Sequence, residues 1–400
     1  MLKSSLLFCL MAVMMNCAGQ SEKENASAAT KVKGVIGGPF ENGEFMFIGM
    51  PEKISSVDTS AGWHRSAQKL VVKGTVFKRD GKTPAPDVIL YYYHTDDHGL
   101  YANHDELDQR VKRHGYLRGW VKSDQKGNYA IYTLRPAPYP NADEPAHIHP
   151  AIQDPGVENP YYLDALVFDD DPLLTTAKRK AMENRGGSGV LRPLLDGDVQ
   201  IAEHNIILGL NIPGHPDKEA FENVSGKNIG EDVVSFTPFH AWGPDKGTRT
   251  CPICKYGRYH GLLYFVGNTP NWDHIEKWLV FLEQESAKRK QYLKSYFIYG
   301  NEDDYSMTGR TKELEALGKK LGLQHLALTF VPSFHDKSSE VDLNKIDPNI
   351  ESTILLYRNR NIIDKFIGLE PTESNFRKVT ERLDHTTDDL FQLPTLLGHD

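Results

Sequence analysis

The chain has 400 residues, more than a single hydrophobic core usually organises, so we expect two domains and an additional tail. Hydrophobic residues make up 39% of the chain and charged residues 25%, as in ordinary globular proteins. The formal net charge of -8 and the lack of a basic stripe argue against a nucleic-acid-binding surface.

Residues 1–17 have the features of a targeting segment. Lys3 precedes an apolar run from Leu6 to Met15, which is too short to span a bilayer but suits a signal-peptide core. Cys17 ends the segment, which resembles a bacterial lipoprotein signal in which this cysteine is lipidated. Asn16 departs from the small residue usual there, and plain secretion is the alternative. We therefore expect a cell-envelope protein on the periplasmic or surface side of a bacterial membrane, held only by a lipid anchor.

A flexible tether is expected over residues 18–40, and an all-β sandwich over residues 41–216. Strand-like runs alternate with turns, as in "KLVVKGTVFKRDGKTPAPDVILYYYHT" and "GWVKSDQKGNYAIYTLRP". "YYLDALVFDD" and "EHNIILGLNIPG" predict further strands, and one short helix is expected around Thr175 to Glu183. Several short strands at such intervals are typical of a sandwich.

The sequence changes character after a linker predicted over residues 217–230, which is rich in glycine and polar residues. From there, residues 231–400 predict the order strand, helix, strand, helix, strand, strand, strand, helix. This alternation indicates a separate α/β domain.

Four side chains of the β-rich region could together bind one metal ion. Tyr101 lies in "DDHGLYANH", Tyr139 in "RPAPYP", and both His147 and His149 in "PAHIH". Residues two positions apart point to the same face of an extended backbone. Phenolate oxygen favours Fe(III), whereas zinc more commonly takes cysteine, histidine and carboxylate. A close histidine pair alone is more often structural or incidental.

In their order, these motifs resemble the intradiol ring-cleavage dioxygenases of the catechol and protocatechuate type, from about Lys69 to Pro216. The resemblance implies that Tyr101, Tyr139, His147 and His149 hold a non-haem Fe(III). It also implies that a catechol binds as a chelating dianion and that Tyr139 leaves the metal to act as a base. O2 would then cleave the ring between its hydroxyl-bearing carbons, with both oxygen atoms entering a muconate-type diacid.

Two positions depart from that family. Glu144 stands where the family usually has an arginine that is thought to stabilise charge on the ring, and Ala165 stands at the place of a glutamine. An anion beside an anionic ring is unfavourable unless the substrate is cationic or Arg135 supplies the positive charge. The sequence therefore leaves two interpretations open: an oxidoreductase acting on a small aromatic substrate, or a non-catalytic iron- or ligand-binding sandwich.

Cys251 and Cys254 form a CxxC pair in "TRTCPICKYG". Residues 231–400 resemble a thioredoxin-like domain in strand and helix order, although this CxxC precedes the strand "LLYFVG" instead of following the first central strand. A structural disulfide, a redox-active pair that gives the domain a thiol-redox function, and a zinc half-site with His240 or His260 stay open. Homo-oligomer formation also stays open.

Overall fold

The structure is a computed structural model that describes residues 36–40, 43–217, 224–303 and 305–396. The predicted signal segment, Cys17 and the tether up to residue 35 lie outside the described residues. Within the described ranges, no helix is both long enough and apolar enough to cross a membrane.

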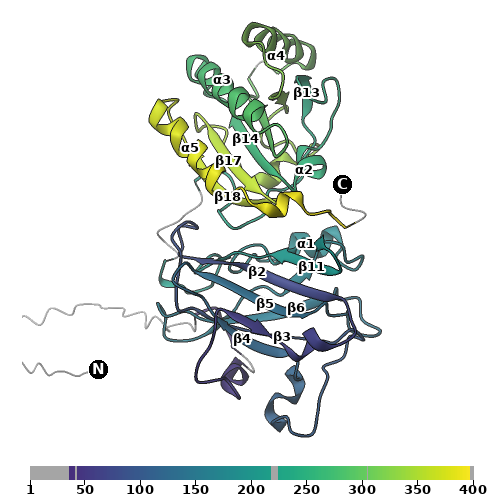
Figure 1. Ribbon diagram of the computed structural model, residues 1–400. Coiled ribbons are helices and arrows are strands. Elements are labelled where there is room, and N and C mark those ends of the chain that lie inside the picture. The colour runs from purple at the N-terminus through teal and green to yellow at the C-terminus, as the bar shows by residue number, and fades with distance from the viewer. Residues whose placement is uncertain (1–35, 41–42, 218–223, 304, 397–400) are drawn as a thin grey trace, which may run out of the picture. The chain divides into compact units, whose positions relative to one another are not determined.

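The N-terminal half is built from short strands that form two six-stranded sheets (Figure 1). One sheet has the order β1-β5-β2-β11-β10, with β12 paired to β2, and the other has the order β4-β3-β6-β8-β9, with β7 paired to β6. The strands are β1 (Val57–Thr59), β2 (Lys69–Phe77), β3 (Ile89–His94), β4 (Arg118–Lys122), β5 (Asn128–Leu134), β6 (His147–Gln153), β7 (Tyr161–Tyr162), β8 (Leu166–Phe168), β9 (Val190–Leu191), β10 (Leu194–Asp196), β11 (Val199–Glu203) and β12 (Ile206–Ile207).

The turns predicted within the two strand-rich stretches, between β2 and β3 and between β4 and β5, connect strands of different sheets. The chain passes from β2 in the first sheet to β3 in the second, and returns from β4 to β5. At the first turn the Asp80 carboxylate accepts hydrogen bonds from the backbone N–H of Lys82 and Thr83, and Gly81 has φ 68°. The Asp124 carboxylate caps the second turn in the same way. These turns therefore fold the sequence into two layers, and the predicted sheet-rich character is confirmed.

Alternating side chains of the two sheets form one hydrophobic core. Leu70 and Val72 of β2 belong to the same buried cluster as Leu90 of β3 and Ile148 of β6. Helices are few in this half: α1 (Thr176–Ala181), close to the expected helix, and 3-10 helices at Gly43–Phe47, Ala61–His64 and Gln109–His114.

The C-terminal half contains one six-stranded sheet with the order β13-β16-β15-β14-β17-β18. Strands β14, β15 and β16 are parallel, whereas β13, β17 and β18 pair antiparallel to their neighbours. The elements are β13 (Phe239–Trp242), α2 (Pro252–Tyr256), β14 (His260–Val266), α3 (Trp272–Lys288), β15 (Leu293–Tyr299), α4 (Met307–Leu321), β16 (Ala327–Phe330), β17 (Thr353–Arg358), β18 (Asn361–Ile367) and α5 (Glu373–His385), with 3-10 helices at Val341–Asn344 and Asp389–Gln392.

Both faces of this sheet are covered. Leu262 and Tyr264 of β14 pack in one cluster with residues of α3, α4 and α5, while Leu263 and Phe265 pack in another with Ile253 of α2. Every residue of β14 is therefore buried. The predicted order from β14 to α5 is confirmed, and β13 and α2 are additional; the thioredoxin-like assignment stays a prediction.

Candidate metal centre

The two histidines of the predicted donor set begin strand β6. Ile148, between them, points into the sandwich core and is fully buried, so His147 and His149 emerge together on the opposite face. Their rings meet edge to face with centroids 4.5 Å apart. Tyr101 lies in the loop after β3, and Tyr139 in the loop between β5 and β6. The sheet pairs β6 with β3, which brings the first of these loops to the histidines.

The four donor atoms converge on one point. Tyr139 Oη lies 2.5 Å from Tyr101 Oη, 3.2 Å from His147 Nε2 and 3.4 Å from His149 Nε2. Tyr101 Oη lies 3.0 Å from His149 Nε2, and the two Nε2 atoms are 2.9 Å apart. The structure thus brings all four sequence-predicted donors together, with Tyr139 in contact with each of the others.

Contacts with residues outside the donor set orient the imidazole rings of His147 and His149. His147 Nδ1 lies 2.7 Å from the Pro145 carbonyl oxygen and donates its hydrogen there, so that the lone pair of a neutral ring is on Nε2. The His149 ring stacks on Tyr93 at 4.5 Å, and Tyr93 stacks in turn on His114 at 3.8 Å. Ring stacking and the carbonyl contact therefore hold both Nε2 atoms toward the tyrosines.

Burial dominates the electrostatics of this cluster. It raises the pKa of Tyr101, where the hydrogen bond between Tyr101 and Tyr139 adds to the effect, and it also raises the pKa of Tyr139. Burial and the neighbouring His147 lower the pKa of His149 to about 3. Since two neutral imidazoles would face each other with lone pairs, a cation among the four donors would relieve this repulsion. The described residues contain no group of three or more His, Cys, Asp or Glu side chains fit for a metal, and here two of the four donors are tyrosines.

A cavity of about 490 Å³ opens beside His149. Its volume lies in the range of small-molecule pockets. The lining residues are Pro39, Tyr93, His149, Pro150, Tyr162, Leu163 and Ala165. Tyr93 and Tyr162 were not predicted from the sequence. The sequence signal for Tyr93 is its place in "YYYH", because this strand pairs Tyr93 with His149 across the sheet.

The remaining predicted residues of this site have different surroundings. Glu144 is exposed, and Ala165 lines the cavity. Arg135 forms two contacts with the Asp170 carboxylate, at 2.5 and 2.6 Å, and one with Gln200 at 3.1 Å. Its guanidinium also lies over the Phe168 ring. Arg135 is thus engaged by Asp170, and the described contacts do not join it to the four donors.

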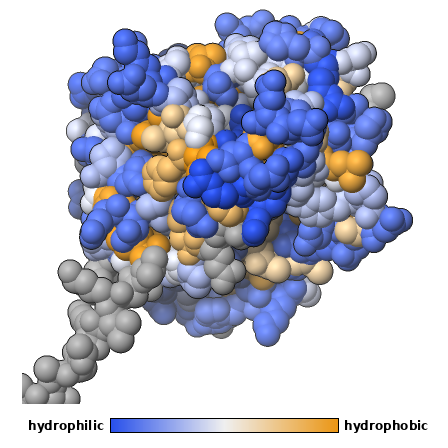
Figure 2. Space-filling view, turned by 90° about the horizontal axis from the view of Figure 1, so that it is seen from below, coloured by the Kyte–Doolittle hydropathy of each residue, from blue (hydrophilic) through white to orange (hydrophobic). Residues whose placement is uncertain are grey.

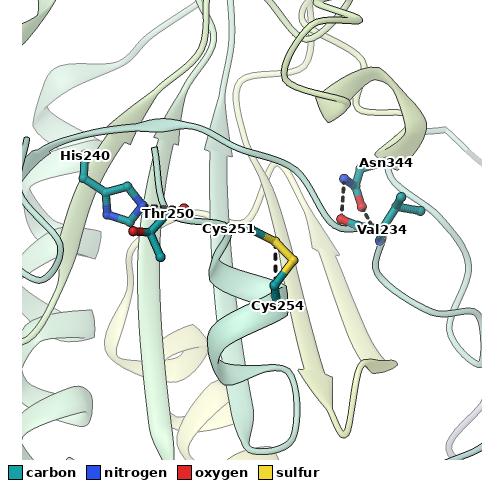
Figure 3. The surroundings of a disulfide bond; sticks show 6 residues. All are labelled: Val234, His240, Thr250, Cys251, Cys254 and Asn344. Atoms are coloured by element: carbon teal, nitrogen blue, oxygen red, sulfur yellow. Dashed lines mark hydrogen bonds between the residues drawn. A yellow bond between two sulfur atoms is a disulfide. The ribbon is translucent and has the colours of Figure 1, made fainter. Parts of the chain in front are cut away.

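Cys251 and Cys254 form a disulfide at the start of α2 (Figure 3). The Cys251 sulfur accepts a hydrogen bond from the backbone N–H of Cys254, and Cys254 is the exposed member. His240 is buried, with its ring nitrogens against the carbonyl oxygens of Pro244 and Thr250. Neither this histidine nor any third ligand completes a zinc site in the part of the chain that the structure describes.

The surface of the chain is mainly hydrophilic on the face shown in Figure 2, with separate hydrophobic spots. Among the described residues, the large hydrophobic side chains that are exposed include Phe47, Val57 and Leu100. Leu100 precedes the donor Tyr101 in the chain.

The region that contains the four donors is similar to proteins of a known family. Residues 50–187 match the dioxygenase family model. The match covers 138 of the 400 residues and includes Tyr101, Tyr139, His147 and His149. The predicted family is thereby confirmed for the N-terminal region.

Two curated relatives are chlorocatechol 1,2-dioxygenases. The protein from Pseudomonas putida is 30% identical over 122 residues, which cover 26% of this chain and 45% of the relative. A second, from another Pseudomonas, is 28% identical over 135 residues, which cover 30% of this chain and 51% of the relative. The chain therefore spans about half the length of the curated relatives it matches.

Solved structures give similar but weak matches. Hydroxyquinol 1,2-dioxygenase from Pseudomonas putida is 25% identical, with a TM-score of 0.30 over 40% of this chain and 61% of that chain. 3-Chlorocatechol 1,2-dioxygenase from Rhodococcus opacus is 19% identical, with a TM-score of 0.31 over 40% of this chain and 66% of that chain.

Proposed function

We propose that the protein is a non-haem Fe(III)-dependent intradiol dioxygenase that cleaves a catechol-type ring with O2. The observation that carries the proposal is the convergence of Tyr101, Tyr139, His147 and His149 on one point, with Oη and Nε2 atoms 2.5 to 3.4 Å apart. The family match of residues 50–187 supports it.

The donor set fits Fe(III) on chemical grounds. Two phenol oxygens and two imidazole nitrogens suit a trivalent, oxygen-preferring ion better than zinc. His147 Nδ1 donates to the Pro145 carbonyl, which keeps Nε2 free to ligate. When bound, Fe(III) would supply Lewis acidity that lowers the pKa of both hydroxyls of a catechol.

The four donors and the residues that line the cavity would have different roles in the reaction. Tyr101, His147 and His149 would hold the ion, because His147 and His149 are in strand β6 and Tyr101 contacts both Tyr139 and His149. Tyr139 lies in a loop between β5 and β6; as a phenolate released from the other donors, its oxygen would accept a proton from a substrate hydroxyl and become a phenol. The aromatic walls of the cavity beside His149 orient the substrate ring.

Iron loading with a visible spectrum tests the proposal. The purified protein is loaded with iron, and we expect about one iron per chain and a tyrosinate-to-Fe(III) charge-transfer band. Addition of catechol should shift this band, and the loaded protein should consume one O2 per catechol. Protein that binds no iron or stays colourless would contradict the metal site, and coloured but inert protein would leave only a non-catalytic iron-binding module.

We also propose that the protein lies in the cell envelope and that Cys17 is lipidated. A tether, a sandwich over residues 41–216 and a second domain over residues 231–400 would follow this cysteine. Metabolic labelling with a radioactive fatty acid tests the anchor. We expect label on the native chain and none on Cys17→Ser, and label on neither would restrict the proposal to plain secretion.

A second function, thiol-disulfide exchange, is favoured by the geometry of the Cys251–Cys254 pair. A low-molecular-weight thiolate would attack the exposed Cys254 sulfur, and Cys251 would leave as a thiolate that accepts the hydrogen bond from the Cys254 N–H. A second thiolate would then release the dithiol and a small-molecule disulfide. Thiol titration before and after incubation with glutathione tests this, and unchanged counts would assign a purely structural role to the disulfide.

A further inference from the structure

The segment over residues 36–40, which we call the strap, is fixed on the β-sandwich. The Gly37 N–H donates to the Pro213 carbonyl oxygen at 2.7 Å, and the Gly37 carbonyl oxygen accepts a hydrogen bond from the Arg185 guanidinium at 2.6 Å. Gly37 has φ 76°, and a Cβ atom at this position would lie 2.5 Å from the Cβ of Tyr161, so the close approach requires glycine. The last five residues of the expected tether are therefore bound to the sandwich.

The strap passes along the cavity beside His149. Pro39 is one of the residues that line this cavity. The next residue, Phe40, packs its ring on Tyr162, which also lines the cavity, with the ring centroids 4.6 Å apart. Contacts on both sides of Pro39, through Gly37 and Phe40, therefore hold its ring as a wall of the cavity.

The lining of the cavity is mostly apolar and aromatic. It contains no lysine, arginine, aspartate or glutamate, and apolar surface comes from Pro39, Pro150, Leu163 and Ala165. Ala165 stands where the resembled family has a glutamine, so a methyl group replaces a polar side chain here. A charged substituent would lose its water in this cavity without gaining an opposite charge, whereas an apolar substituent gains free energy by leaving water.

We propose that this cavity binds an alkyl substituent of the catechol, and that Pro39 of the strap is a specificity-determining residue. The inference rests on the proposed dioxygenase function. His149 belongs both to the donor set and to the cavity lining, so a substituent on a catechol held at the donors reaches the cavity. The volume of about 490 Å³ exceeds what the bare ring fills and leaves room for a branched alkyl group. The substrate class is therefore catechols with an apolar side chain, in preference to catechols with a charged one.

Two catechols with side chains of similar shape test the inference on the iron-loaded protein. One has a 3-methylbutyl group and the other a 2-carboxyethyl group at the same ring position, so the two compounds differ mainly in charge, and 4-methylcatechol is the reference. Calorimetry without O2 gives the three Kd values, and O2 consumption gives kcat/KM. We expect the 3-methylbutyl compound to bind about tenfold more tightly than 4-methylcatechol, because a hydrophobic pocket gains affinity with each added methylene. The 2-carboxyethyl compound should bind no more tightly than the reference.

Variants assign the preference to the strap. Pro39→Ala removes ring surface from the cavity wall, and Phe40→Ala removes the packing on Tyr162 that holds the strap. Each should lower the preference for the 3-methylbutyl over the 2-carboxyethyl compound by about threefold or more. This preference is a ratio measured on one preparation, so incomplete folding or iron loading does not change it. Pro51→Ala is the matched control, because Pro51 is an exposed proline like Pro39 but does not line the cavity, and it should keep the native ratio.

The outcomes separate this inference from the function on which it rests. Equal binding of the two compounds, or a native ratio in Pro39→Ala, would overturn the inference while leaving the dioxygenase in place. If none of the three catechols binds to the iron-loaded protein, the dioxygenase proposal and the inference fail together.

Discussion

Tyr139 is the donor whose loss tests the chemistry most directly, since its oxygen contacts all three other donors. Tyr139→Phe removes the proposed base and one ligand, so we expect kcat for catechol to fall by about a hundredfold or more. The charge-transfer band should also shift, because only one tyrosinate is left. Stopped-flow absorbance and O2 consumption measure the two effects.

Tyr132→Phe is the control for this change. Tyr132 is a half-buried residue of β5 that packs edge to face on Trp63, away from the donors. It should leave both kcat and the spectrum unchanged. Native turnover in Tyr139→Phe would remove this residue from the mechanism.

Removal of the metal should lower thermal stability. A ligand that binds only the folded protein stabilises it by RT ln(1 + [L]/Kd), which is about 4 kcal/mol at a thousandfold excess over Kd. We therefore expect chelation of the iron to lower Tm by several degrees, and added Fe(III) to restore it. Scanning calorimetry measures the shift in Tm, and the double variant Tyr101→Phe with His149→Ala should show no shift. If iron does not change the Tm of the native protein, this result would argue against iron binding at the cluster.

The four side chains that the sequence predicted as donors lie together, but the sequence did not predict what surrounds them. Alternation along "HIH" placed His147 and His149 on one face, as the structure has them. The stacking of Tyr93 on His149 depends on the pairing of β3 with β6, which the local sequence does not encode. In the same way, the engagement of Arg135 by Asp170 joins residues 35 positions apart, so it could not be predicted from composition or spacing.

Asp171 connects the loop of Tyr139 and Glu144 to the β8 region. Its carboxylate accepts hydrogen bonds from Ala146 N and Leu173 N, and the side chain is buried. Asp171→Ala would leave buried N–H groups without partners, at about 1 to 3 kcal/mol for such a group. We expect a lower Tm together with weaker iron binding, because the loop that precedes His147 loosens.

Urea unfolding and iron titration check this expectation, with Asp198→Ala as the control. Asp198 is exposed at the turn before β11, where a substitution should change the free energy of unfolding by less than about 0.5 kcal/mol. If Asp171→Ala loses stability but keeps native iron affinity, the loop does not position the metal site.

In the C-terminal half, the sequence predicted the order of the helices and strands well. In the N-terminal half, it was less successful in predicting which strands pair with each other. Long amphipathic helices such as Trp272–Lys288, with buried Ile275, Trp278, Leu279 and Leu282, identify themselves by periodicity. β13 has four residues, and its partner strand β16 lies almost ninety positions later in the chain. Such short elements exist because of tertiary pairing, and this explains why β13 and α2 were missed.

Buried neutral histidines in both halves of the chain should make the protein sensitive to acid. Burial lowers the pKa of His204 to about 4 and the pKa of His260, beside Arg358 and Arg289, to about 3. The unfolded chain has the ordinary pKa of about 6.5, so it binds more protons than the folded protein below that pH. The stabilisation is therefore complete above pH 6.5 and is lost as the pH falls toward 4, by up to about 3 kcal/mol for each histidine.

The two histidines belong to the two halves of the chain, where His204 contacts the Tyr129 hydroxyl and His260 the Thr386 hydroxyl. We expect Tm to fall steadily between pH 7 and pH 4.5, and to fall less in His204→Gln and His260→Gln, measured by circular dichroism at constant ionic strength. His64→Gln, at an exposed position, should follow the native profile. A native Tm that stays level or rises toward pH 4.5 would show that the burial of these two rings does not control acid stability.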